Sequence, residues 1–363
     1  MTRARPARHP AADRGGPVDW SAVERILVVR TDNLGDVVML TPVLRALRRA
    51  VPRARIDLLA SPAGAAAAPL LAEVRHVITE SVVWQQVHAD VDAATMALAE
   101  LDLVRRVAAG EYDAMLVFTS PTQSPWPAAH VGMLAGIPVR AVHSAEFGGA
   151  VATHWISEPP AGTHQVDRGL HLLEALGVPA AGRALELRLP STVDGLPDSY
   201  VLLAPGGSAP AKRYPAARFA TVAGLLGDIG LDVLVTGTPR EHRLIQSVVD
   251  GAGGGRVRAL EGLDVPALAA VVARADVVLC NNSACMHLAD ALGVPVVVTY
   301  SGTERRSEMR PRTTKAELLH GSVPCAPCRQ FECPYGLECL DIDPEDVARA
   351  ALRLAGIGEV CPL

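Results

Sequence analysis

The chain has 363 residues, of which 49% are hydrophobic and 20% are charged, so it has enough apolar material for two domain cores. Its net charge of −5 lacks the basic excess of a typical nucleic-acid-binding protein, and we expect no nucleic-acid partner. No apolar run reaches the roughly 18 residues of a membrane span, and the first twenty residues lack the apolar segment of a signal peptide. We therefore expect a cytoplasmic protein with at most peripheral membrane contact.

The first half alternates strands and helices. We expect residues 1–22 to be a disordered tail and residues 23–190 to form the first domain. The run Arg25–Arg30 (RILVVR) is continuously apolar, which is typical of a buried parallel strand. The stretch VVMLTPVLRALRRAV, after the turn that follows this strand, has the spacing of a helix. Pro42 either kinks that helix or opens a second helical segment capped by Thr41. Further strands are expected at Arg55–Leu59, Tyr112–Phe118 and Val139–His143, and helices at Ala97–Ala109 and Gln165–Leu176.

The alternation restarts after a Pro- and Gly-containing connection at Leu187–Asp198, so residues 198–363 are expected to form a second domain. Strands are expected at Tyr200–Ala204, Leu231–Thr236, Asp276–Cys280 and Val294–Tyr300, and helices at Ala216–Leu226, Arg240–Val249, Ala267–Arg274 and Ala284–Leu292. The fold class is thus α/β, with two Rossmann-like, doubly wound domains. Such folds bind ligands at the carboxyl ends of their strands, which puts the predicted site in the cleft between the domains.

The turn after the first strand, Thr31–Asp36, contains one glycine and lacks the G-x-G-x-x-G pattern that cradles a dinucleotide. A nicotinamide or flavin enzyme is therefore disfavoured, and we expect no cofactor. Asp36 stands where the next helix begins, and a helix N-terminus favours its ionised, proton-accepting form. A plain helix-capping role is the alternative, and the two roles are compatible.

The loop APGGSAPAKRYP after the first strand of the second domain could contact phosphate. Gly206 and Gly207 allow close backbone approach, Ser208 can donate a hydrogen bond, and Lys212 supplies a charge. Lys212 is one of only two lysines in an arginine-rich chain, which favours a specific role. An ordinary Gly-Pro loop is the alternative.

A third motif, CNNSACMH, follows a predicted strand and opens a helix. The backbone amides of Asn282, Ser283 and Ala284 would face a phosphate at the helix N-terminus. His287 lies one turn further on. It points back toward the ligand or serves as a structural histidine.

Four cysteines form a C-x2-C-x4-C-x5-C pattern over residues 325–339: Cys325, Cys328, Cys333 and Cys339. The pattern could bind zinc, or it could be a reduced structural loop, which we favour. Two D-x-D triplets also invite a metal interpretation. We interpret the triplet at Asp90–Asp92 as a solvated loop, and Asp343 before Pro344 as the cap of a helix.

Together these motifs resemble glycosyltransferase family 9, the lipopolysaccharide heptosyltransferase-like enzymes. The resembling stretches are ILVVRTDNLGDVVMLTPVLRALR, APGGSAPAKRYPAARFA, ADVVLCNNSACMHLADALGVPVVVTYSGT and CAPCRQFECPYGLECLDIDPEDV. The resemblance implies a GT-B fold and an inverting, metal-independent transferase with an ADP-heptose-type donor. It also implies that the cysteine-rich loop is structural.

The resemblance assigns roles to residues of this chain. Asp36 matches the general base, and Lys212 matches the lysine that contacts the diphosphate. The residues implied to bind the donor are Gly207, Ser208, Lys212, Glu241 (facing the ribose), Asn282, Ser283, Ala284 and His287. The family's donor turn reads N-D-S/T-G-P-M-H, whereas this chain has Asn282, Ala284 and Cys285 in place of Asp, Gly and Pro. These departures leave the donor's sugar or base open.

We therefore expect transfer of a sugar, heptose-like and carried by ADP-heptose or a related nucleotide sugar, to a hydroxyl of a glycolipid, a polysaccharide or a small metabolite. Three alternatives remain on the sequence alone. They are a nucleotide-sugar epimerase of the same fold, a non-catalytic nucleotide-sugar-binding protein, and a zinc or iron–sulfur protein built on the cysteine-rich loop.

Overall fold

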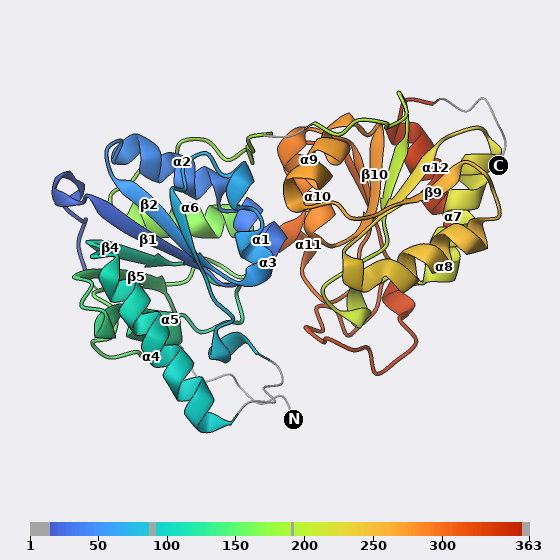
Figure 1. Cartoon of the computed structure of the whole chain (residues 1–363). Helices are drawn as coiled ribbons and strands as arrows, with labels where there is room; N and C mark the ends of the chain where they lie inside the picture. The colour runs from blue at the N-terminus through green and yellow to red at the C-terminus, as the bar shows by residue number, and fades with distance from the viewer. Residues whose placement is uncertain (1–14, 87–91, 190–191, 358–363) are drawn as a thin grey trace.

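The computed structural model describes residues 15–86, 92–189 and 192–357. Figure 1 shows two halves side by side, each a parallel sheet with helices packed on its faces. The predicted pair of Rossmann-like α/β domains is confirmed. Within the described part of the chain, no helix is long and apolar enough to cross a membrane.

The first half contains a six-stranded parallel sheet in the order β3-β2-β1-β4-β5-β6. β1 lies near the centre, with Ile26 in register with Ile56 and Ala114, and its apolar side chains are almost completely buried. The strands are β1 (Arg25–Arg30), β2 (Arg55–Ala60), β3 (His76–Thr79), β4 (Ala114–Val117), β5 (Val139–His143) and β6 (His154–Ile156). The helices are α1 (Leu34–Val38), α2 (Thr41–Ala50), α3 (Pro62–Ala65), α4 (Ala93–Ala109), α5 (Trp126–Leu134) and α6 (Gln165–Ala175).

The ordered part of this half begins before residue 23, where the disordered tail was predicted to end. Trp20–Ala22 form a short 3-10 helix, and the indole of Trp20 donates to the carbonyl oxygen of Leu176 at 2.9 Å. The amide of Val18 donates to the same carbonyl. These two bonds satisfy the carbonyl oxygen of Leu176, at the end of α6. The prediction of a disordered tail is therefore wrong for this segment. Residues 1–14 lie outside the described residues.

Pro42 opens a second helix, which confirms one of the two interpretations of this proline. It lies in the first turn of α2, where a missing backbone N–H costs nothing. Thr41 does not cap α2, because it is already helical and its hydroxyl donates to the carbonyl oxygen of Val38. Leu40 is the capping residue, and it has no side-chain cap bond.

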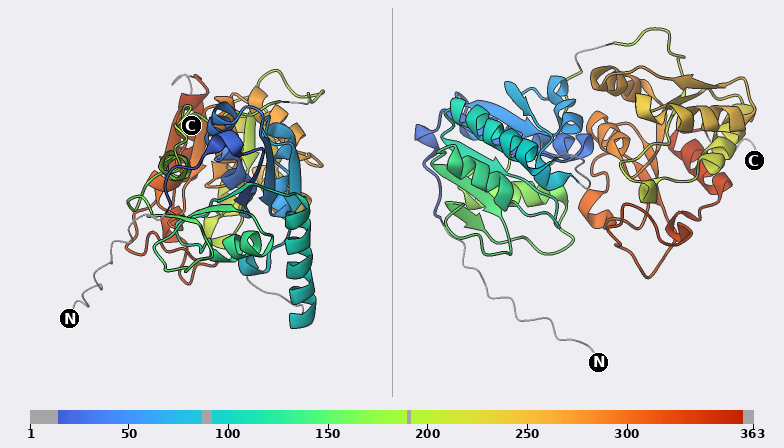
Figure 2. Two further views of the ribbon diagram at one scale, coloured as in Figure 1. Left: turned by 90° about the vertical axis from the view of Figure 1, so that its left-hand side faces the viewer. Right: turned by 60° about the horizontal axis from the view of Figure 1, so that its bottom comes forward.

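The second half repeats the architecture, with strand order β12-β11-β10-β7-β8-β9. Its strands are β7 (Val201–Ala204), β8 (Val233–Thr236), β9 (Val257–Leu260), β10 (Val277–Asn281), β11 (Val296–Thr299) and β12 (Ala316–Leu319). Its helices are α7 (Ala216–Asp228), α8 (His242–Ala252), α9 (Val265–Arg274), α10 (Ala284–Leu292), α11 (Arg306–Met309) and α12 (Pro344–Leu354). Figure 2 shows the chain crossing from one half to the other along one side of the molecule.

Both aspartates that end the D-x-D triplets are helix caps. Asp343 accepts from the amide of Glu345 and precedes Pro344 in the first turn of α12, which confirms that prediction. Asp92 caps α4 by accepting from the amides of Ala94 and Thr95. Asp90 lies outside the described residues.

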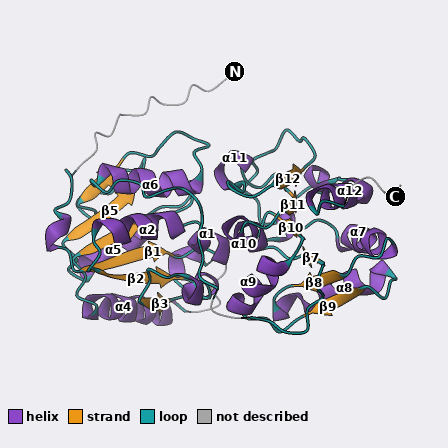
Figure 3. Ribbon diagram, turned by 90° about the horizontal axis from the view of Figure 1, so that it is seen from above, coloured by secondary structure: helices purple, strands orange, loops and turns teal. Residues whose placement is uncertain are grey.

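The two halves meet where α1 packs against α10, as Figure 3 shows from above. Gly35 makes this close approach possible, because a Cβ atom there would lie 2.6 Å from the imidazole of His287 and 3.4 Å from the Cα of Ala284. One apolar cluster continues across the contact and includes residues of both sheets. The helix that carries Asp36 is thus held directly against the helix of the CNNSACMH motif.

Candidate active site

A cleft of about 400 Å³ lies between the two halves, beside the contact of α1 with α10. Its walls come from the N-terminal end of α1, the loops after β7 and β8, and the beginning of α10. The predicted site residues all line it: Asp36, Gly207, Ser208, Lys212, Glu241, Asn282, Ser283, Ala284 and His287. The structure therefore brings together residues that are up to 251 positions apart in the sequence, from Asp36 to His287.

Asp36 is the third residue of α1, where it forms a capping box with the N-cap residue Asn33, and it also lines the cleft. One carboxylate oxygen accepts from the backbone amide of Asn33 at 3.2 Å, and the other accepts from the guanidinium of Arg30 at 2.9 Å. Arg30 is 3% exposed and also pairs with the buried carboxylate of Asp32 at 2.9 Å. The structure thus shows the capping contact and places Asp36 at the cleft, where its role as a proton acceptor stays a prediction.

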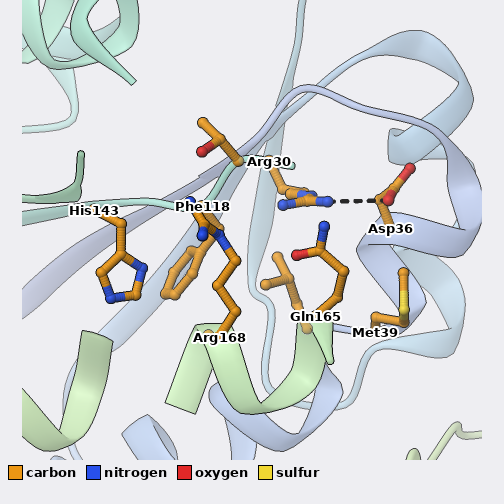
Figure 4. A pocket seen from close by; sticks show the side chains of 10 residues that line it. Arg30, Asp36, Met39, Phe118, His143, Gln165 and Arg168 are labelled. Carbon is orange, nitrogen blue, oxygen red and sulfur yellow. Dashed lines mark hydrogen bonds and ion pairs between the residues drawn. The ribbon is translucent and has the colours of Figure 1, made fainter. Parts of the chain in front are cut away.

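Arg30 and Asp36 also line a small cavity of about 10 Å³ inside the N-terminal half, shown in Figure 4. Gln165 and Arg168 reach it from α6, and His143 reaches it from β5. Burial lowers the pKa of His143 well below its usual value, so this imidazole is neutral near pH 7. The one sign of the Arg30 contact in the sequence is an arginine at the end of an otherwise apolar strand.

The Gly-rich loop after β7 is fixed by Glu241. One oxygen of this carboxylate accepts from the amide of Gly207 at 3.2 Å, and the other accepts from the amide and hydroxyl of Thr238, each at 2.9 Å. Gly206 is packed against the same carboxylate, which leaves no room for a Cβ atom. Glu241 therefore ties the loops after β7 and β8 together while it lines the cleft.

Lys212 has a partner that the sequence did not suggest. Its ammonium group lies 2.8 Å from the carboxylate of Glu304, which also accepts from the side-chain amide of Asn282 at 3.2 Å. The oxygen of that amide accepts from the backbone and hydroxyl of Ser301. Asn282 therefore links the start of α10 to the turn after β11.

Asn281, the residue before Asn282, fixes the Gly-rich loop through side-chain hydrogen bonds. Its side chain is completely buried, donates to the carbonyl oxygens of Pro205 and Gly206, and accepts from the amide of Tyr214 and the hydroxyl of Thr299. Every hydrogen-bonding group of the side chain is thus used. The sign of this role in the sequence is an asparagine at the end of an apolar strand, and it was not predicted.

His287 lines the cleft as a neutral group. It is 6% exposed, and burial lowers its pKa to about 4. It therefore carries no charge for a phosphate near pH 7, and its ring instead fills the space above Gly35. Burial likewise raises the pKa of Cys285 to about 12, so this thiol stays protonated.

The cysteine-rich loop packs against the site through its backbone. The amides of Cys328 and Arg329 donate to the carbonyl oxygens of Gly302 and Thr303, and the carbonyl oxygen of Phe331 accepts from the amide of Ala211. Its cysteines carry free thiols. Across the residues that the structure describes, no three His, Cys, Asp or Glu side chains are grouped so as to hold a metal ion.

The family model for glycosyltransferase family 9 (heptosyltransferase) matches residues 101–338, which is more than half of the chain. The chain belongs to glycosyltransferase family 9. It is therefore a glycosyltransferase, as the sequence motifs predicted.

Individual relatives of this family 9 glycosyltransferase are distant. It is 23% identical to lipopolysaccharide heptosyltransferase 3 of Escherichia coli over 290 residues, which cover 74% of this chain and 81% of the relative. The structure of ADP-heptose lipopolysaccharide heptosyltransferase II of E. coli superposes with a TM-score of 0.73 at 20% identity, covering 92% of this chain and 99% of the other. A family 9 glycosyltransferase from Veillonella parvula gives a TM-score of 0.72 at 21% identity, covering 92% and 98%. These structures share the fold of this chain.

Proposed function

We propose that this family 9 glycosyltransferase transfers a heptose-like sugar from ADP-heptose or a related nucleotide sugar to an acceptor hydroxyl, with inversion and without a metal ion. The observation that carries the proposal is the cleft itself. A carboxylate from the N-terminal half, Asp36, lines it together with Lys212 and the N-terminal amides of α10. These groups have the chemistry needed for a base on one side and a diphosphate on the other.

The donor's diphosphate would lie against the Gly-rich loop, Lys212 and the start of α10. Negative charge develops on the diphosphate as the glycosidic bond breaks, and fixed positive groups stabilise that charge without reorganising. The ammonium group of Lys212 and the amides at the N-terminus of α10 are such groups. They supply the positive charge that a bound cation supplies in other transferases, so the proposed mechanism needs no metal ion.

Asp36 would remove the proton of the acceptor hydroxyl as its oxygen attacks the anomeric carbon from the face opposite the diphosphate. Attack from that face inverts the configuration. The ion pair with Arg30 keeps one carboxylate oxygen fixed, and each oxygen still has a lone pair for the incoming proton. The acceptor would be a glycolipid, polysaccharide or small molecule that presents its hydroxyl at Asp36.

Donor binding is the first test, by calorimetry with a panel of ADP-heptose, GDP-hexoses and UDP-hexoses. We expect one donor to bind clearly, and we expect Lys212→Ala to weaken that binding. Lys315→Ala, which removes the other lysine of the chain, is the matched control and should bind like the wild type. If no donor binds, or if Lys212→Ala binds as well as the wild type, the proposed donor site is wrong.

The same donor, incubated without acceptor, separates transfer from the remaining alternatives. A transferase leaves the sugar stereochemistry of its donor unchanged under these conditions, whereas an epimerase converts it. A binding protein without catalytic activity would bind the donor and transfer nothing to any acceptor.

A further inference from the structure

The cleft contains many carboxylates for a site that would hold a diphosphate. Its lining includes Asp36, Glu241, Asp264 and Glu304, and Lys212 is the one lysine or arginine among the described residues that line it. Carboxylates without partners would repel a diphosphate, so the partner of each carboxylate determines its role.

Three of the four carboxylates bind groups that shape the protein. Asp36 is held by Arg30, Glu241 by the amides of Gly207 and Thr238, and Asp264 caps α9 by accepting from the amide of Ala267 at 2.8 Å. Glu304 differs, because both of its partners are groups that the ligand itself would contact. They are the ammonium of Lys212 at 2.8 Å and the side-chain amide of Asn282 at 3.2 Å.

The cysteine-rich loop holds both members of the Lys212–Glu304 pair. It binds the turn at Gly302 and Thr303, immediately before Glu304, and Phe331 binds the amide of Ala211, immediately before Lys212. The side chains of Lys212 and Glu304 are only 17% and 20% exposed. The pair is therefore fixed by the fold from two directions and is not a loose surface ion pair.

We infer that Glu304 accepts hydrogen bonds from hydroxyl groups of the donor's sugar and is a specificity-determining residue for that sugar. An ammonium group has three N–H donors, and Glu304 uses one, which leaves two for diphosphate oxygens. Lys212 thus lies between the carboxylate and the diphosphate. The sugar is bonded to the distal phosphate, so its hydroxyl groups are the part of the nucleotide sugar next to the diphosphate. A carboxylate is a strong acceptor of hydrogen bonds from hydroxyl groups.

Asn282 is the second residue that holds the Glu304 carboxylate. An aspartate at position 282 would put a second carboxylate about where the amide now stands, 3.2 Å from Glu304. Two carboxylates that close repel each other, and the amide donor to Glu304 would be lost. The departure of this chain from the family's donor turn is thus what gives Glu304 a hydrogen-bond donor instead of a second carboxylate as its neighbour.

The test compares ADP with ADP-heptose by calorimetry in the wild type and in Glu304→Gln. The inference rests on the proposed function, since it requires a nucleotide-sugar donor. The readout is the ratio of the two dissociation constants, because freeing Lys212 acts on both ligands through their shared diphosphate. We expect Glu304→Gln to reduce the preference for ADP-heptose over ADP by roughly tenfold or more, the range for a lost hydrogen bond to a charged group. Asn282→Asp should reduce the same ratio.

Glu317→Gln is the matched control, because Glu317 is also an ion-paired glutamate of the C-terminal half. Its carboxylate lies 2.7 Å from the guanidinium of Arg353, and it does not line the cleft. It should leave both constants unchanged. If Glu304→Gln alters the binding of ADP and ADP-heptose by the same factor, Glu304 is only a counter-ion of Lys212 and the inference is overturned. If the wild type binds neither ligand, the proposed ADP-linked donor and the sugar contact both fall.

Discussion

Asp36 takes part in local folding and also lines the cleft where the proposed chemistry would take place. Its carboxylate closes the first turn of α1 through the amide of Asn33 and is oriented by Arg30, yet it still lines the cleft. A carboxylate held by a capping box and by an ion pair is already fixed in direction. Orienting the proposed base therefore requires no further element.

Replacing Asp36 with Asn should lower turnover by roughly 100-fold or more, since a general base contributes that much and an amide cannot accept the proton. The donor's dissociation constant should change little, because the amide keeps the shape of the side chain. Initial rates of transfer and calorimetry of donor binding measure the two quantities. Asp102→Asn, on the exposed face of α4, is the control. Transfer at a near-normal rate in Asp36→Asn would rule out Asp36 as the base.

Residues named by a local motif were easier to predict than residues that act through distant partners. Asp36 and Lys212 each belong to a motif that follows a buried strand, and the carboxyl ends of such strands were predicted to border the cleft. Glu304 lies 92 residues from Lys212 in the sequence. Its role depends on a side-chain contact that only the folded chain creates, so no spacing in the sequence reveals it.

At the scale of elements, the contact of α1 with α10 positions the two sides of the cleft. α1 carries Asp36, and the N-terminal residues of α10 line the opposite wall. The separation of these helices is set by Gly35, which has no side chain to meet His287. A small change in that separation moves the proposed base relative to the proposed diphosphate site.

Gly35→Ala should therefore slow transfer by roughly 10- to 100-fold, because a misplacement of about 1 Å between reacting groups has an effect of this size. His287→Ala removes the ring that the new methyl group would meet, so Gly35→Ala should cost less in that background. Gly255→Ala, where a Cβ atom meets nothing within 4 Å, is the control. A double-mutant cycle on the transfer rate measures the coupling. Equal losses in both backgrounds would contradict the proposed contact.

The central strands and the capped helices were predicted well, and the edge elements were missed. β1, β5 and α10 have the predicted limits, and an apolar run marks β1 while a small-residue turn marks the start of α10. β3, β6, β9 and β12 were not predicted. They have three or four residues each, and β3 and β12 are only partly buried, so they lack a long continuous apolar run. α5 was missed as well, because its apolar residues are not confined to one face.

For the whole molecule, buried histidines couple stability to pH. Burial lowers the pKa values of His164 and His287 to about 4, and it also lowers that of His143 well below its usual value. In the unfolded chain these groups take up protons near pH 6.5. Their contribution to folding is therefore complete above pH 6.5 and is lost as the pH falls toward 4.

The free energy of unfolding should decrease between pH 7 and pH 5, by on the order of 2 kcal/mol at pH 5 for each histidine with a folded pKa of about 4. Urea unfolding at several pH values measures it. His164→Asn keeps a capping residue at the start of α6 and should give a shallower dependence on pH, whereas the exposed His76→Asn should leave the slope as in the wild type. A free energy of unfolding that is constant from pH 7 to pH 5 would contradict this account.

The close packing of Gly35 on His287 also limits how this enzyme can be recombined with its relatives. The halves contain separate sheets, so an exchange of the C-terminal half near the connection would leave both sheets intact. The incoming half would nevertheless have to present the same helix surface to α1, including a side chain at position 287 that fits over a residue without a Cβ atom. Chimeras that match this contact should keep α1 packed against α10, and chimeras that do not match it should fold into two intact halves whose cleft is misaligned.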